Sequence, residues 1–118
     1  MLVIKLELTR RAMLDLHEIK DYSIQAFGQN VASEYLDDVE AALSMIQEYP
    51  DLLKSKKNIS NFFQFYQVRN HYLVCTRAKR HVIVLTIKHC QMDIPERLLE
   101  LEPNLLKEAE LLYGKLFE

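Results

Sequence analysis

Two amphipathic helices separated by a single glycine constrain the fold of this chain more than any other feature. Apolar residues recur every three or four positions over residues 10–27 and again over 29–49, which is the period of a helix with one buried face. Thr9 can cap the first helix, Gly28 can end it in a left-handed conformation, and Pro50 stops the second. The sequence therefore predicts an αα-hairpin. Its predicted buried stripes are Ala12, Leu16, Ile19, Ser23 and Phe27, then Ala32, Tyr35, Leu36, Val39, Leu43 and Ile46.

Four other segments have the composition of β-strands. Residues 2–8 alternate large apolar side chains with smaller or charged ones, the two-residue period of a half-buried strand. Three later runs are rich in aromatic and β-branched residues and are separated by short breaks, so they predict three antiparallel strands joined by tight turns. These runs cover residues 62–68, 72–76 and 81–87. We expect the aromatic residues of the first run, Phe62, Phe63, Phe65 and Tyr66, to fill a core rather than to stack on bases.

The order of these elements predicts one α+β domain, because 118 residues suffice for one core and are too few for two domains. It would contain an N-terminal strand, the αα-hairpin, a three-stranded antiparallel β meander and a C-terminal helical segment, with the helices on one face of a mostly antiparallel sheet. Asp93, Pro95 and Glu96 are residue types that start a helix. Residues 98–118 are predicted to form a helical C-terminal extension of the single domain 1–118.

The charge of the chain is strongly segregated along the sequence. The segment from Lys54 to His89 contains no Asp or Glu, whereas residues 1–53 have ten acidic and four Lys or Arg residues. A positive field concentrated in one region attracts an anionic partner, although lysines at strand edges can also serve only to prevent aggregation. We expect the polar connection 51–61 to be a functional loop. The cations of this segment are Lys54, Lys56, Lys57, Arg69, Arg77, Lys79, Arg80 and Lys88.

Several classes of protein do not fit the sequence. No apolar run approaches the roughly 18 residues of a membrane-spanning helix, and the N-terminus lacks the pattern of a targeting segment, so we expect a cytoplasmic protein with no membrane partner. Cys75 and Cys90 lack the paired spacing of a zinc site or a disulfide framework. We therefore expect buried free thiols, no metal and no cofactor.

The ordered set of these features resembles the RelE/ParE superfamily of bacterial type II toxins. The resemblance covers about residues 2–97 and weakens beyond Glu102. It implies a RelE/ParE-like fold, growth inhibition, a role in plasmid stabilisation, and a small antitoxin that wraps and silences the toxin. The residues that carry it are Ala12, Asp15, Leu16, Ile19, Tyr22, Phe27, Gly28, Ala32, Tyr35, Leu36, Tyr49, Pro50, Arg69, Arg77, Ile87, Lys88, His89 and Met92 to Arg97.

The superfamily contains two activities, and the resemblance alone leaves both open. RelE-like members cleave messenger RNA on the ribosome, whereas ParE-like members act on DNA gyrase. Cleavage by a 2′-hydroxyl needs a general base, a general acid and cations over the developing charge. The candidates for these roles are His89, Arg69, Arg77, Lys54 and Lys56.

Two departures favour the ParE-like branch. No Tyr or acidic residue accompanies His89, while the segment 92–95 resembles ParE-like chains. A net charge of −2 is also unfavourable for docking on phosphate-rich RNA. The resemblance thus implies a non-enzymatic toxin that acts on DNA gyrase, with a ribosome-dependent mRNA endoribonuclease as the alternative. A member that only binds its antitoxin is a third possibility. In each case we expect the eight cations between Lys54 and Lys88 to contact an acidic segment of the antitoxin.

Overall fold

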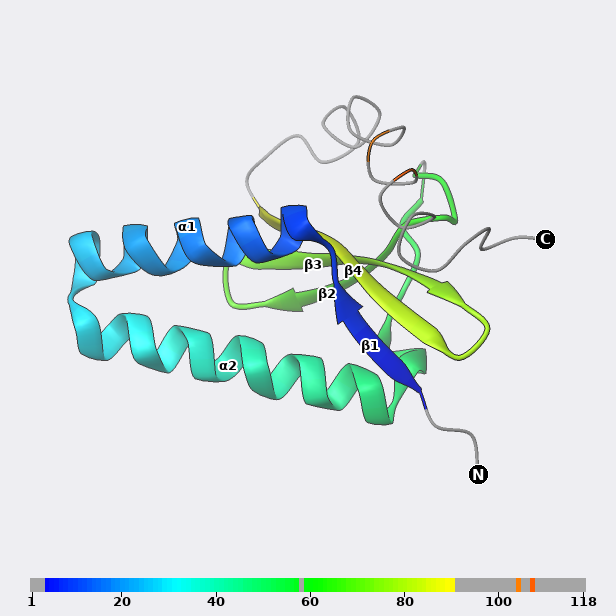
Figure 1. The fold of residues 1–118 in the computed structure, drawn as a ribbon, viewed down its shortest axis with the longest axis horizontal. Helices are drawn as coiled ribbons and strands as arrows, with labels where there is room; N and C mark the ends of the chain where they lie inside the picture. The colour runs from blue at the N-terminus through cyan, green and yellow to red at the C-terminus, as the bar shows by residue number, and fades with distance from the viewer. Residues whose placement is uncertain (1–3, 58, 91–103, 105–106, 108–118) are drawn as a thin grey trace.

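The computed structural model describes residues 4–57, 59–90, 104 and 107, and it shows an αα-hairpin packed on a β-sheet (Figure 1). The predicted helix start at Asp93 and the extension 98–118 lie outside the described residues, apart from positions 104 and 107. The elements in chain order are β1 (Lys5–Leu8), α1 (Arg10–Phe27), α2 (Gln29–Glu48), the short 3-10 helix η1 (Pro50–Leu52), β2 (Gln64–Val68), β3 (His71–Ala78) and β4 (His81–His89).

All four strands belong to one sheet in the order β1-β4-β3-β2. The β2-β3-β4 meander is antiparallel, whereas β1 joins its edge parallel to β4, with Lys5 opposite His81 and Leu8 opposite Val84. The predicted α+β class and the antiparallel meander are confirmed. The predicted start of the second run at Tyr72 is one residue late, because His71 already pairs with His89 in the sheet.

Local capping explains where the helices begin and end. The Thr9 hydroxyl accepts a hydrogen bond from the Ala12 amide at 3.1 Å and donates one to the Leu85 carbonyl at 2.7 Å, which attaches the start of α1 to β4. Gly28 has φ 90° and ψ 169°. Its positive φ was predicted but its ψ is extended rather than left-handed helical. One glycine separates the two helices, since its amide bonds the Ile24 carbonyl and its carbonyl accepts from the Ala32 amide.

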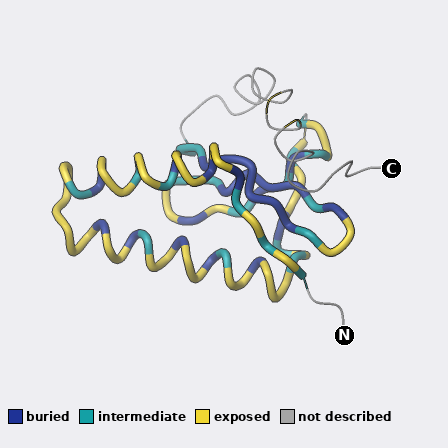
Figure 2. Tube along the Cα trace, viewed as in Figure 1, coloured by how far each residue is buried: buried dark blue, intermediate teal, exposed yellow. Residues whose placement is uncertain are grey.

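The core lies on both faces of the sheet, and the helices cover one of them (Figure 2). On the helix side, Val39 and Ile46 pack with Leu73 and Val84. The opposite face contains the predicted aromatic core residues Phe63 and Phe65, both almost fully buried. Burial of these apolar surfaces is the main source of stability, at about 25 cal/mol for each Å² removed from water.

Two predictions about local environment are wrong. Phe27 was expected on the buried stripe of α1, yet it is 63% exposed, because the tip of the hairpin projects past the sheet (Figure 1). The connection 51–61 was expected to lack regular structure. It contains the end of η1 and a bridge in which Lys54 exchanges two backbone hydrogen bonds with Phe65, at the outer edge of β2.

Candidate partner-binding surfaces

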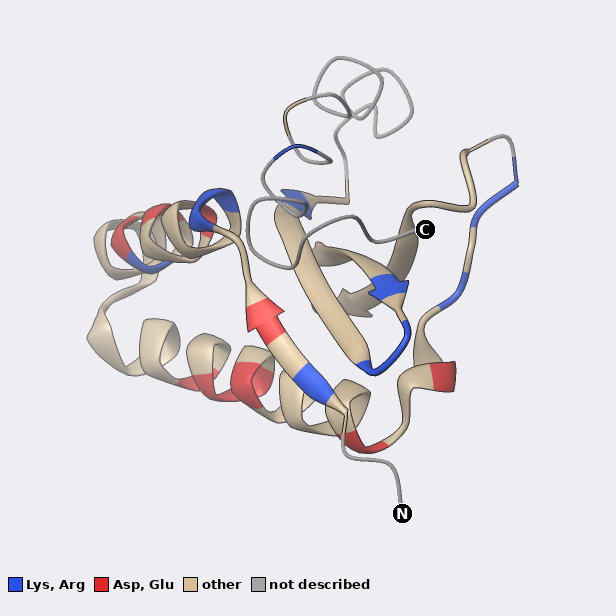
Figure 3. Ribbon diagram, turned by 45° about the vertical axis from the view of Figure 1, so that its right-hand side comes forward, with Lys and Arg blue, Asp and Glu red and all other residues tan. Residues whose placement is uncertain are grey.

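The structure divides the predicted cationic residues between the two ends of the sheet. Arg77, Lys79 and Arg80 lie at the β3–β4 turn, while Arg69 lies at the β2–β3 turn and Lys88 is paired with Tyr72 near that same end. Arg77 lies six positions after His71 in β3, or roughly 20 Å at the rise of a strand. Figure 3 shows the positive segments on the loop before β2 and on the β3–β4 turn. The continuous positive segment of the sequence therefore forms separate groups in space.

Carboxylates from earlier in the chain neutralise two of these cations. Arg69 Nε lies 2.6 Å from Asp38 Oδ2, and Arg77 Nη1 lies 3.1 Å from Asp51 Oδ1. Both pairs are largely solvent-exposed, so each contributes little to stability. They instead reduce the positive potential around Arg69 and Arg77. The segment 54–89 contains no Asp or Glu, but in the folded protein it has acidic neighbours from earlier in the chain.

Three lysines of the loop before β2 have different environments. Lys54 is exposed and pairs through its backbone with Phe65, and Lys57 is exposed. Lys56 instead lies over the Tyr72 ring, 4.3 Å from its centroid, and donates to the Tyr72 hydroxyl at 3.2 Å. Its packing fixes the loop against the sheet through a cation–π contact.

The five candidate catalytic residues do not all converge on one site, and Lys56 is held on the Tyr72 ring. His89 and Arg69 line one pocket beside the β2–β3 turn. Arg77 lies at the opposite end of β3, and Lys54 bridges Phe65 between the two ends. General acid–base catalysis requires groups within hydrogen-bond reach of one substrate, and this spread does not provide it.

A polar cluster that the sequence did not indicate surrounds His71. The hydroxyl of Tyr35, from α2, hydrogen-bonds Nδ1 of His71, and the two rings meet edge to face with centroids 5.5 Å apart. His71 in turn lies edge to face with His89 at 5.1 Å. The guanidinium of Arg69 lies 5.2 Å from the centroid of the Tyr35 ring. Arg69 adopts φ 50° to reach this position, a conformation that favours glycine.

Burial determines the protonation states within this cluster. Desolvation raises the pKa of the Tyr35 phenol, so it remains a neutral donor. Desolvation, with a smaller effect of neighbouring His89, lowers the pKa of His71. Both directions favour the uncharged forms, in which the Tyr35 hydroxyl can donate a hydrogen bond to Nδ1 of His71.

A second buried polar contact joins α1 to β4. Asp15 is only 5% exposed, and its Oδ2 accepts hydrogen bonds from the Thr86 hydroxyl and, at 3.0 Å, from the Ile87 amide. The strand is irregular here, since the pairing of β3 with β4 shifts between Val74 and Cys75. The carboxylate thus satisfies donors that the irregular strand presents to the helix.

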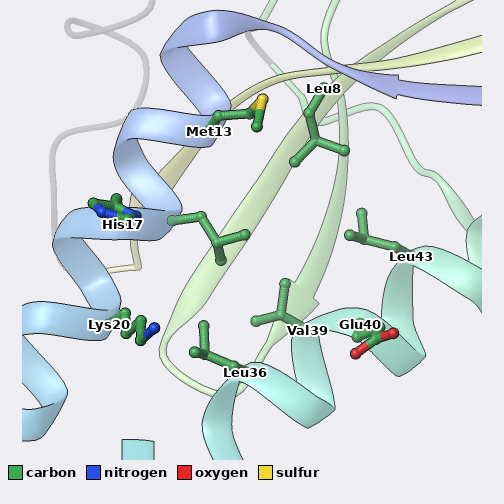
Figure 4. Close-up of a pocket in the computed structure, with 9 residues that line it drawn as sticks. Leu8, Met13, His17, Lys20, Leu36, Val39, Glu40 and Leu43 are labelled. Carbon is green, nitrogen blue, oxygen red and sulfur yellow. The ribbon is translucent and has the colours of Figure 1, made fainter. Parts of the chain in front are cut away.

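On the other side of the hairpin, α1 and α2 form an open apolar groove of about 360 Å³ (Figure 4). Met13 lies at its edge and is 61% exposed, while Leu36 and Leu43, predicted as core, are only partly buried. Polar side chains from both helices contribute to its lining. The lining residues are Leu8, Met13, Leu16, His17, Lys20, Leu36, Val39, Glu40 and Leu43.

The described residues provide little support for other kinds of site. They contain no group of three or more His, Cys, Asp or Glu side chains able to hold a metal ion. None of the helices in these residues is long and apolar enough to cross a membrane. Cys75 and Cys90 are free thiols, and burial raises the pKa of both. Cys75 is buried as expected, but Cys90 is partly exposed.

Most of the described fold lies within the match to one protein family. Residues 6–94 match the family described as ParE toxin of type II toxin-antitoxin system, parDE. The chain therefore belongs to the ParE toxin family, which confirms the RelE/ParE resemblance and its ParE-like branch.

One similar sequence and one similar structure agree with this assignment, the structure at the level of the fold alone. Toxin ParE1 of Caulobacter vibrioides (strain ATCC 19089 / CIP 103742 / CB 15) is 29% identical over 86 residues, which cover 73% of this chain and 88% of the relative. A chain from the solved structure of the chromosomal ParDE TA system from P. aeruginosa superposes with a TM-score of 0.67 at 15% identity. That match covers 75% of this chain and 98% of the other, and it shows a common fold.

Proposed function

We propose that this protein inhibits growth in the cytoplasm by acting on DNA gyrase without catalysing a reaction, and that a cognate antitoxin silences it. The observation that carries the proposal is the family match over residues 6–94. The separation of Arg77 and Lys54 from His89 also supports it, because a nuclease would need such groups around one phosphate.

The apolar groove between α1 and α2 is the best candidate for the main antitoxin contact. An amphipathic helix can insert its apolar side into a groove of this kind, covering Met13 and the partly buried leucines. Lys20 and Glu40, both among the lining residues, offer charged partners for the polar side of such a helix. The antitoxin would then be held mainly by apolar burial, with charge selecting its orientation.

The cationic residues of the β3–β4 turn and of the loop before β2 would form a second contact with the same antitoxin. Leu8, at one end of β1, lines the groove, and Lys5, at the other end, donates its backbone amide to the Arg80 carbonyl at 2.8 Å. The groove and the β3–β4 turn are therefore about 10 Å apart along β1. One antitoxin chain can place a helix in the groove and an acidic segment against Lys79 and Arg80.

A supercoiling assay with purified toxin tests the target. We expect the toxin to inhibit DNA gyrase and the antitoxin to restore activity. Unaffected gyrase at an excess of folded toxin would remove gyrase as the target. Mapping of message ends in toxin-expressing cells tests the ribosomal alternative, because new cuts at the ribosomal A site would support a nuclease. Unimpaired growth without antitoxin would instead indicate a member that only binds its antitoxin.

The loop before β2 is best tested at Lys54 and Lys57. A change of Lys56 would also disturb the fold locally, because Lys56 packs on Tyr72. Replacement of Lys54 and Lys57 by glutamate changes two exposed charges while leaving that packing intact. We expect weaker antitoxin binding at low salt and a smaller difference at high salt. Equal affinity at low salt would remove the loop from the antitoxin interface.

A further inference from the structure

A second concave surface lies at the tip of the hairpin, beside the β2–β3 turn. At the projecting tip, Tyr22 and Phe27 are 66% and 63% exposed, and their rings meet edge to face at 6.4 Å. Val31, at the start of α2, is 40% exposed. These side chains border a pocket of about 260 Å³ that extends to the β2–β3 turn. We call Tyr22, Phe27, Val31, Arg69, His71 and His89 the tip surface.

The base of the tip surface is held in place by the polar cluster around His71. Tyr35 bonds His71, and Arg69 is fixed between the Tyr35 ring and Asp38. Arg69 contacts Asp38 through Nε, and within the described residues its two terminal nitrogens make no hydrogen bond, so they can bind another acceptor. The surface thus combines an exposed aromatic pair with an arginine that is already held in position. Tyrosine and arginine are among the residues that contribute most to protein–protein binding energies.

The tip surface and the groove share no lining residue. The groove takes its α1 residues from Met13, Leu16, His17 and Lys20, and the tip pocket takes Tyr22, Ser23 and Phe27. A second pocket continues the tip surface along α1 through Ile19 and Tyr22 toward Lys88. Two partners can therefore use this hairpin without competing for the same side chains.

We propose that the tip surface binds the target protein of the toxin, through a segment that combines an apolar or aromatic side chain with a carboxylate. This inference rests on the proposed function, and it assigns the target to a side of the molecule that the antitoxin groove does not use. The apolar side chain would insert between Tyr22, Phe27 and Val31. The carboxylate would face Arg69, since no Asp or Glu among the described residues lines this pocket.

A protein segment fits this surface better than a nucleic acid does. Single-stranded nucleic acids bind where aromatic rings accompany a groove rich in Lys and Arg. Here the Lys and Arg residues of the tip pocket and the adjoining pocket are Arg69 and Lys88. That adjoining pocket also includes Asp15 and Glu18, whose carboxylates would repel a phosphate chain.

The test compares Tyr22→Ala/Phe27→Ala with the matched control Leu14→Ala/Tyr49→Ala. Leu14 and Tyr49 are also exposed, at 49% and 54%, and lie outside the described groove and tip pockets. Each full-length protein is assayed for growth arrest, inhibition of gyrase supercoiling, antitoxin affinity and thermal midpoint. We expect the tip variant to need on the order of 100-fold more protein for half-inhibition. Its antitoxin affinity and midpoint should match those of the control.

Three results would overturn the inference. The tip variant could arrest growth as strongly as the control, or it could lose antitoxin affinity together with toxicity, which would make the surface part of the antitoxin interface. Alternatively, wild type could bind a short single-stranded DNA or RNA oligonucleotide with a strength that the tip variant loses. If wild type arrests growth but leaves gyrase unaffected, the gyrase assignment fails while the growth comparison still tests the tip surface. A wild type that does neither contradicts both proposals.

Discussion

The two sides of the helical hairpin are built from different kinds of contact. On one side, the groove between α1 and α2 is lined mostly by leucine, valine and methionine, and it remains open. On the other side, Asp15 makes buried hydrogen bonds to β4, and Tyr35 makes a partly buried one to β3. Apolar contacts are nondirectional and can be completed by a partner, whereas a buried hydrogen bond must be satisfied within the fold. The groove is thus suited to being covered by a partner, and the polar contacts hold the hairpin, and with it the tip surface, in position.

The largest expected effect of breaking the polar side comes from Asp15→Ala. It leaves the Thr86 hydroxyl and the Ile87 amide without their acceptor. We expect the free energy of unfolding to fall by about 3 kcal/mol, measured by urea denaturation. Glu18→Ala, at an exposed position of the same helix, is the control and should change it by less than about 0.5 kcal/mol. Equal effects would mean that the carboxylate does not hold α1 on the sheet.

The corresponding change on the groove side is Met13→Asp. Because it places a carboxylate where an apolar helix side should lie, we expect antitoxin affinity to fall about 30-fold, or about 2 kcal/mol. Leu14→Asp adds the same charge one residue later, outside the groove, and should bind nearly as wild type does. Isothermal titration with the antitoxin measures both. Similar losses in the two variants would show that added charge alone, rather than the groove, weakens binding.

A smaller effect on the polar side is expected from Tyr35→Phe. The ring and its packing remain, but Nδ1 of His71 loses its donor. We expect a loss of about 1 to 1.5 kcal/mol in the free energy of unfolding and little change in antitoxin affinity. Thermal and urea denaturation provide the first value and titration the second. A variant as stable as wild type would mean that the hydrogen bond between Tyr35 and His71 does not stabilise the fold.

The smallest expected effect is the pH dependence of stability that His71 causes. Its pKa is lowered in the folded protein, so the unfolded chain binds the proton more readily below the ordinary histidine pKa of about 6.5. Stability should therefore fall as the pH decreases below that value. His71→Gln keeps an acceptor for Tyr35 and removes the titration, so its stability should change less between pH 7 and 5. Identical pH profiles would exclude His71 as the cause.

Much of the fold could be predicted because its signals are local. Thr9, Gly28 and Pro50 mark the hairpin through capping and backbone geometry that involve neighbouring residues only. The parallel pairing of β1 with β4 could not be predicted in the same way, since it joins residues more than 70 positions apart. Periodicity also could not show that α1 projects beyond the sheet, which is why Phe27 was assigned to the core.

The site was less predictable, because each surface is assembled from distant segments. Arg69 and Asp38, 31 positions apart, form an ion pair that a linear count of charges cannot include. His71 was assigned to a turn, so its contact with Tyr35 was missed. The groove left a weak signal in the sequence. Met13 lies outside the predicted stripe of α1, and such additional apolar positions on a surface helix indicate a helix that is incompletely covered.

The central claim is that the two sides of the hairpin bind different partners, and reciprocal growth assays test it most directly. Met13→Asp and Tyr22→Ala/Phe27→Ala are each expressed with and without antitoxin. Met13→Asp should arrest growth and resist rescue by the antitoxin. The tip variant should be harmless alone, yet its excess should release coexpressed wild-type toxin by occupying the antitoxin. If both variants lose the same function, one surface serves both partners and the claim is wrong.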